Sequence, residues 1–183
     1  TLVEHTPRAQ MKLRRNPLYW NNAENQINTV FFYPIEDQAA ALKRFEAGEV
    51  DFAEGPPSTQ VDRVKKKYAD QFKTFSILGT YYFEFNVKNA PFNNPKLRQA
   101  LSMAIDRQII IDRIGKLGQT PAYSWVPPGT QNHAPFQPAY ASWTQEKRNG
   151  IAKELFSEAV AGNDEPVNVE ILYNTSEGHK KIA

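Results

Sequence analysis

Residues 80–87 constrain the fold of this chain most strongly, because apolar and polar side chains alternate along the whole segment. Successive side chains of a β-strand point to opposite faces of the sheet. One face would hold Tyr81, Phe83, Phe85 and Val87, and the other would hold Thr80, Tyr82, Glu84 and Asn86. We therefore expect a strand with an aromatic core face and a polar face on which a phenol and a carboxylate lie side by side.

Shorter strand-like and helix-like segments lie on both sides of this strand. Strands are expected where apolar residues alternate or form short runs, in residues 1–35, 49–53, 72–77 and 167–173. The run at residues 29–33 is almost wholly apolar, which is typical of a strand buried on both faces. Helical spacing appears in residues 36–47, 58–68, 95–105, 110–115, 145–161 and 177–183. Residues 118–140 are rich in proline and predict a long loop that has a role or wraps a surface.

Helix-capping residues support several of these boundaries. Asn94 precedes Pro95, a combination typical of an N-cap followed by proline in the first helical position. Thr144 can cap the long helix that follows it. Gly48 and Gly162 fit the C-terminal ends of two helices, because glycine adopts the left-handed conformation that ends many helices.

The composition excludes several classes of protein. Hydrophobic residues make up 40% and charged residues 23%, as in ordinary soluble globular proteins, and no apolar run approaches the roughly 18 residues of a membrane helix. The net charge of +2 is too small to indicate a nucleic-acid-binding surface, so no nucleic acid is expected as a partner. The chain contains no cysteine, which excludes disulfides, thiol catalysis and cysteine-ligated zinc.

Motifs for catalysis or metal binding are missing from the sequence. His5, His133 and His179 are far apart and do not have metal-ligand spacing. There is no Gly-x-Ser-x-Gly motif, no Walker loop and no GxGxxG motif. The polar face of residues 80–87 is then the best candidate site. Tyr82 and Glu84 would lie either on a solvent-facing strand edge or on the wall of a binding cleft, where a few polar groups orient a ligand.

Several segments occur in an order and with a spacing typical of one protein family. They include residues 15–20, 45–51, 79–86, 91–101, 104–107, 121–123, 127–128, 145–149 and 172–176. With this set the chain resembles the solute-binding proteins of oligopeptide ABC transporters, in the oligopeptide and murein-tripeptide branch of the family 5 extracellular solute-binding proteins. Each segment alone is a weak signal, whereas the ordered set covers nearly the whole chain and is specific.

The resemblance implies an α/β fold of the type II periplasmic binding proteins, in which two lobes close over a ligand. The chain would be an internal, incomplete fragment that holds parts of both lobes. Residues 1–78 would form part of the first lobe, and residues 79–89 would form a strand or hinge that crosses between the lobes. Residues 90–183 would begin the second lobe, which is truncated at its C-terminus.

The resemblance also implies a function in transport without catalysis. The full-length protein would capture short peptides in the cleft between the lobes and deliver them to an ABC permease in the inner membrane. It would act as a monomer, in the periplasm or as a cell-surface lipoprotein in a Gram-positive organism. No catalytic residue, metal ligand or cofactor is expected. A non-peptide ligand such as nickel, haem or a sugar stays an alternative, and so does a hydrolase that acts on peptides or glycans.

Four residues are expected to bind the ligand, because they match the part of the family that borders the peptide cleft. Gly79 and Thr80 would lie at the edge of the cleft. Tyr82 matches a tyrosine that lines a side-chain pocket, and Glu84 matches an acidic residue that can face a basic peptide side chain. Glu54 occupies a position at which relatives carry a tyrosine. The family's residues that neutralise the termini of the peptide have no counterpart within residues 1–183.

Overall fold

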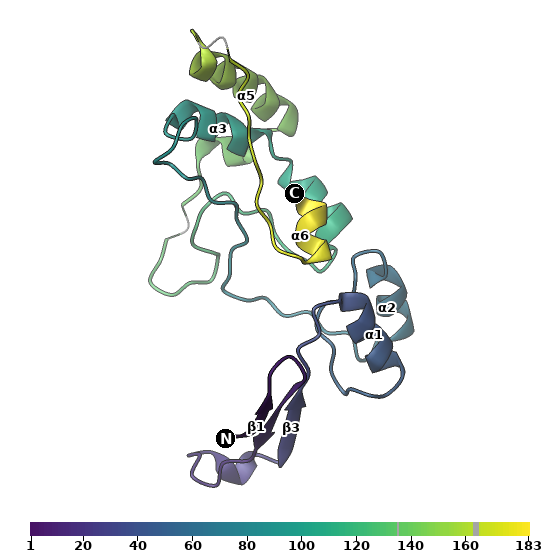
Figure 1. Cartoon of the computed structure of the whole chain (residues 1–183). Coiled ribbons are helices and arrows are strands. Elements are labelled where there is room, and N and C mark those ends of the chain that lie inside the picture. The colour runs from purple at the N-terminus through teal and green to yellow at the C-terminus, as the bar shows by residue number, and fades with distance from the viewer. Residues whose placement is uncertain (135, 163–164) are drawn as a thin grey trace. The chain divides into compact units, whose positions relative to one another are not determined.

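The computed structural model describes residues 1–134, 136–162 and 165–183 (Figure 1). These residues form two compact units, Thr1–Pro57 and Ser58–Ala183. The division lies upstream of residues 79–89, and the assignment of those residues to a crossing between two lobes stays a prediction. Within the described ranges, no helix has both the length and the apolar character needed to cross a membrane.

The first unit contains an antiparallel sheet with the strand order β1-β2-β3 (Figure 1). Strand β1 (Leu2–Thr6) pairs with β2 (Gln10–Arg14), which pairs in turn with β3 (Thr29–Phe32). Met11 lies opposite Phe32 and Leu13 lies opposite Val30, so the register places apolar side chains together across the strands. The β-structure predicted for residues 1–35 is confirmed, and a short 3-10 helix, η1 (Asn22–Glu24), lies between β2 and β3.

The burial predicted for residues 29–33 is wrong. Val30, Phe31 and Phe32 are 37%, 47% and 51% exposed, because no second layer covers β3 within its own unit. A sheet buries an apolar face only against another element. The apolar run correctly predicted the strand, and the missing second layer accounts for its exposure.

Helix α1 (Gln38–Glu46) follows the sheet and begins directly after Asp37, which caps it. The Asp37 carboxylate accepts a hydrogen bond from the Ala40 backbone N–H at 2.7 Å, which satisfies one of the unpaired donors of the first turn. The helix buries Leu42 and ends beside Gly48, whose φ of +73° allows the chain to leave the helix in a left-handed conformation. The helix predicted for residues 36–47 is therefore confirmed.

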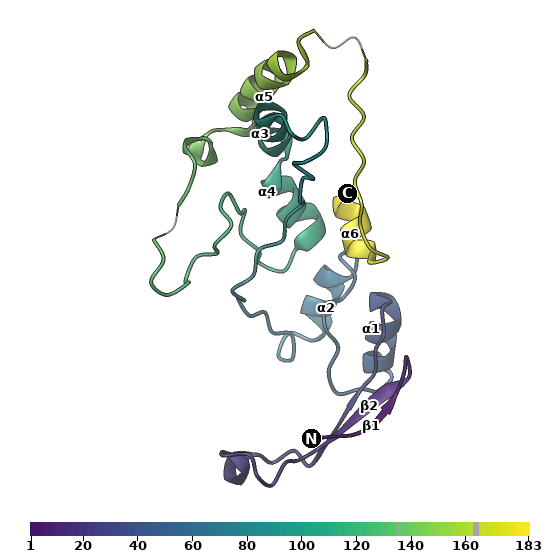
Figure 2. The ribbon, with the colours of Figure 1, turned by 60° about the vertical axis from the view of Figure 1, so that its left-hand side comes forward.

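The core of the second unit lies between two helices, α3 (Pro95–Ala104) and α5 (Gln145–Val160), which run side by side in both ribbon views (Figures 1 and 2). The buried apolar residues at this contact are Leu97, Ala100, Met103 and Ala152. Both helices begin at the caps that the sequence predicted. The Asn94 Oδ1 accepts from the Lys96 N–H at 2.9 Å, and the Thr144 Oγ1 accepts from the Lys147 N–H at 3.3 Å.

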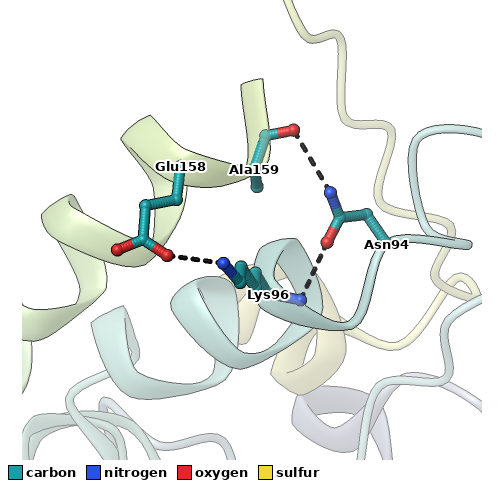
Figure 3. Close-up of polar contacts among 4 residues, drawn as sticks. All are labelled: Asn94, Lys96, Glu158 and Ala159. Carbon is teal, nitrogen blue, oxygen red and sulfur yellow. Dashed lines mark hydrogen bonds and ion pairs between the residues drawn. The ribbon is translucent and has the colours of Figure 1, made fainter. Parts of the chain in front are cut away.

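Asn94 also joins the two helices (Figure 3). Its side-chain N–H donates to the Ala159 carbonyl of α5 at 3.2 Å, while its oxygen caps α3. Beside it, the Lys96 ammonium forms an ion pair with Glu158 at 2.7 Å, but both of these side chains are more than half exposed. Because an exposed ion pair gains little over hydration, Asn94 is expected to contribute more to this contact than the ion pair does.

Replacing Asn94 by alanine should therefore lower the free energy of unfolding by about 1–2 kcal/mol, because it removes a helix cap and a hydrogen bond between helices. Replacing Lys96 by methionine should change it by less than about 1 kcal/mol. Urea denaturation of the intact protein that carries this chain measures both values. Equal losses for the two variants would contradict this ranking.

The remaining helices of this unit are short. Helix α2 (Val61–Lys67) buries Val61 and Val64 and exposes its three lysines, and α4 (Arg107–Ile109) continues into a π-helical turn, η2 (Ile110–Gly115). A 3-10 helix, η3 (Ala139–Ser142), precedes α5, and α6 (Glu177–Ile182) lies against η2. Residues 118–134 and 136–138 lack helix and strand, as the proline-rich composition predicted.

The strands predicted at residues 49–53, 72–77, 80–87 and 167–173 are absent from the described structure. The predicted core face at residues 80–87 is also wrong, since Tyr81, Phe83 and Val87 are between 36% and 52% exposed. A strand is held by backbone hydrogen bonds to a neighbouring strand, and none of the described residues supplies such a neighbour. An alternating pattern alone cannot supply that partner.

Candidate functional site

The four predicted site residues lie in a segment without regular secondary structure that leads from α2 toward α3. Gly79 and Glu84 are exposed, and no hydrogen bond or ion pair of Glu84 occurs among the described residues. Thr80 is half-buried, and Tyr82 is 51% exposed. Thr80 and Tyr82 both contact a second segment, the proline-rich loop.

Trp125 is the residue of that loop that Thr80 and Tyr82 both contact. The Thr80 hydroxyl donates a hydrogen bond to the Trp125 carbonyl at 2.9 Å. The rings of Tyr82 and Trp125 lie 4.3 Å apart between centroids, at an angle of 59°. This tilted contact is slightly closer than the separation of about 4.5–7 Å that aromatic pairs prefer. The two side chains thus form an aromatic corner that keeps much of its surface open to solvent, since Trp125 is 65% exposed.

An open pocket of about 320 Å³ adjoins this corner. Its lining consists of Leu78, Thr80, Trp125, Val126, Pro127 and Thr130. Thr130 donates its hydroxyl proton to the Pro127 carbonyl at 2.9 Å, and Thr80 donates to Trp125. Because both hydroxyl protons are already used, the pocket offers an occupant a mainly apolar surface.

Two arginines contact Tyr123, which lies in the loop two positions before Trp125. The guanidinium carbons of Arg107 and Arg148 lie 4.8 Å and 5.3 Å from the centre of the Tyr123 ring, which is the range of a cation–π contact. Arg107 also donates to the Ala122 carbonyl at 2.8 Å and to the Ser102 carbonyl at 2.8 Å. The loop is therefore attached to α4 and α5 immediately before the pocket begins.

Tyr81 lies apart from this pocket and contacts the C-terminal helix. Its ring is 5.2 Å from the imidazole of His179 and 5.8 Å from the ring of Phe83. Partial desolvation of the hydroxyl raises the pKa of Tyr81 above its ordinary value. Tyr81 is therefore a neutral phenol at physiological pH and can donate a hydrogen bond.

A second hollow, of about 450 Å³, has a polar lining that includes Asp62, Asp112, Lys116 and Gln119. Lys116 donates to Asp62 at 2.9 Å, so these two charges compensate each other. Asp112 accepts hydrogen bonds from the Gln108 amide. In the described ranges, no three histidine or acidic side chains are grouped so that they could hold a metal ion.

The sequence predicted a site at Thr80 and Tyr82 but did not indicate Trp125, which contacts both of them. The two segments are separated by 45 residues, and the sequence contains no periodic pattern that relates them. The only available signal was the long proline-rich loop, which predicted a role without naming a residue. Gly79 and Glu84 make no contact with Trp125 that the structure records, and the ligand-binding role of all four residues stays a prediction.

Comparison with known proteins places the whole chain in one family. The family model described as bacterial extracellular solute-binding proteins, family 5 Middle, matches residues 1–183. The periplasmic oligopeptide-binding protein OppA of Salmonella typhimurium is 40% identical over 172 residues, which cover 93% of this chain and 32% of that protein. The chain thus spans about a third of the length of the curated relatives that it matches.

Solved structures agree with this assignment. The murein tripeptide-binding protein MppA of Escherichia coli superposes with a TM-score of 0.89 at 35% identity, over 99% of this chain and 36% of that one. Haemophilus influenzae OppA, solved with the peptide RPPGFSPFR, superposes with a TM-score of 0.86 at 38% identity, over 100% of this chain and 36% of that one. The predicted α/β binding-protein fold is confirmed, and the chain belongs to the family 5 bacterial extracellular solute-binding proteins.

Proposed function

We propose that the protein carrying this chain is the solute-binding component of an ABC transporter and captures short peptides without transforming them. It delivers them to a membrane permease and acts in the periplasm. The observation that carries this proposal is the match along the whole chain to Haemophilus influenzae OppA, which was solved with a bound peptide. The names of the oligopeptide-binding and murein-peptide-binding relatives support the same ligand class.

The side chains of the candidate site suit a binding role. An aromatic corner formed by Tyr82 and Trp125 offers apolar surface, and the exposed carboxylate of Glu84 lies two positions along the chain from Tyr82. Binding sites typically combine apolar walls with a few polar groups that fix the orientation of the ligand. An extended peptide would add main-chain hydrogen bonds, which tolerate many side chains. Gly79 and Thr80 would border that main chain.

Calorimetry and native mass spectrometry of the intact protein test this proposal. We expect one bound tripeptide or tetrapeptide per protein, and no change in the mass of the peptide after release. Free amino acids, sugars and nickel serve as competing ligands. Retention of one of these in place of peptides would contradict the proposed ligand class, and cleavage of a peptide library would indicate a hydrolase instead.

Glu84 is expected to select basic side chains. Replacing Glu84 by glutamine should weaken the binding of a peptide with a central lysine or arginine about 10-fold, because an ion pair is replaced by a hydrogen bond to a neutral amide. The affinity for trialanine should change less than about 2-fold, since the alanine side chain has no charge that could pair with Glu84. Calorimetric titration of both peptides measures the difference.

Glu154 provides a matched control for this variant, because it is an exposed glutamate on α5. The substitution Glu154→Gln removes the same charge from the protein and should leave both affinities unchanged. If Glu84→Gln weakened the basic peptide and trialanine equally, Glu84 would not act as a selective contact.

A further inference from the structure

We infer that Trp125 determines specificity, as the main wall of a side-chain pocket that takes a large apolar side chain of the ligand. This inference rests on the proposed peptide-binding function and assigns a second side-chain preference, separate from that of Glu84. The pocket lies between residues 78–80 and residues 125–130, on the loop that no sequence motif marked as a binding element.

Trp125 contacts two residues of the segment that is predicted to bind the ligand. Its carbonyl accepts from the Thr80 hydroxyl at 2.9 Å, and its ring contacts the ring of Tyr82 at 4.3 Å. Trp125 therefore joins the predicted ligand segment directly. With 65% of its surface exposed, the side chain retains a large aromatic area that no described residue covers.

The lining of the pocket is mainly apolar. Leu78, Val126 and Pro127 add aliphatic surface to the indole, and the two threonine hydroxyl protons in the lining are donated to backbone carbonyls. None of the described residues that line the pocket is ionised. A charged occupant would lose its hydration without a partner, whereas a large apolar side chain gains by leaving water.

Contacts on both sides of Trp125 hold the backbone of the loop. Tyr123 lies against the guanidinium groups of Arg107 and Arg148, and the Ser124 hydroxyl donates to the Val126 carbonyl at 3.2 Å. Thr130 closes the next turn by donating to Pro127. These contacts fix the backbone on both sides of Trp125, so its ring is positioned before a ligand arrives and binding does not have to order it.

Five tripeptides and two variants of the intact protein separate this inference from the proposed function. The peptides are trialanine, Ala-Lys-Ala, Ala-Phe-Ala and the two isomers that carry Phe first or last. We expect Trp125→Ala to weaken the best phenylalanine peptide about 5- to 20-fold, because much of the apolar contact is lost. Trialanine and the lysine peptide should change less than about 2-fold. Glu84→Gln should show the opposite pattern, with the loss confined to lysine.

A matched control lies in the same loop. Phe136 is 67% exposed and does not line the pocket, so Phe136→Ala should leave all affinities unchanged. Labelling with 5-fluorotryptophan adds a direct readout, since the ¹⁹F resonance that disappears in Trp125→Phe belongs to Trp125. That resonance should shift when Ala-Phe-Ala binds and shift less when trialanine binds.

The outcomes are distinguishable. If wild-type protein bound no peptide, the proposed function would be wrong. If peptides bound but Trp125→Ala weakened all of them equally or none of them, the function would stand and the role of Trp125 would be overturned. An unshifted Trp125 resonance in the phenylalanine complex would likewise overturn it.

Discussion

Replacing Leu97 by alanine is expected to lower the free energy of unfolding by about 2–5 kcal/mol. Leu97 is only 1% exposed, and its side chain lies in the contact between α3 and α5. Truncation removes apolar burial and leaves a cavity that two capped helices can only partly close. Chemical denaturation of the intact protein, followed by circular dichroism, measures the loss.

An exposed leucine supplies the control for this substitution. Leu18 is 90% exposed in the first unit, so Leu18→Ala should change the free energy of unfolding by less than about 0.5 kcal/mol. A loss at Leu97 no larger than the loss at Leu18 would contradict the placement of the core between α3 and α5. Peptide affinity at low denaturant should stay unchanged for both variants, because neither residue lines the candidate site.

Replacing Arg148 by methionine is expected to lower the free energy of unfolding by about 2–3 kcal/mol. Arg148 is 6% exposed and donates to the Trp143 carbonyl at 2.6 Å and to the Gln145 side-chain oxygen at 2.9 Å. It also stacks on Tyr123 at 5.3 Å. Methionine keeps most of the apolar volume but leaves half-buried acceptors without donors, and such unpaired groups are costly.

Arg148→Lys separates the charge of this residue from its geometry. Lysine keeps the positive charge but lacks the planar fork that reaches Trp143, Gln145 and Tyr123 together. We expect lysine to recover less than half of the lost stability. Full recovery of the free energy of unfolding would show that residue 148 stabilises the protein through its charge alone. The ¹⁹F resonance of Trp125 in the free protein should also move in Arg148→Met, because Arg148 helps to hold the loop through Tyr123.

Local features of the sequence predicted the helices well. Asn94 with Pro95, Thr144 and Gly48 placed the ends of three helices at or next to their observed positions. Capping depends on side chains and backbone groups within a few residues of each other, so a short stretch of sequence contains all the partners. The family segments could also be recognised from the sequence alone, because recognising them requires no knowledge of contacts between distant residues.

The strands and the burial of side chains could not be predicted in this way. Apolar and polar side chains alternate along residues 80–87 as in a strand, yet these residues form no strand. A strand needs a neighbouring strand with which to pair, and none of the described residues supplies one here. Phe31 and Phe32 are similarly apolar and exposed, because burial requires a second layer. Arg148 shows the reverse: a charged residue within a surface-like pattern is buried, because neighbouring carbonyls and Tyr123 satisfy it.

The sequence by itself thus determined the family of this protein and the ends of three helices, and it proposed Thr80 and Tyr82 as site residues. Only the tertiary structure placed Trp125 against both of them, across 45 residues of chain, and only it revealed the apolar pocket beside them. The physical reason is that capping and periodicity act between near neighbours, whereas a pocket is formed by side chains that the fold brings together from distant segments.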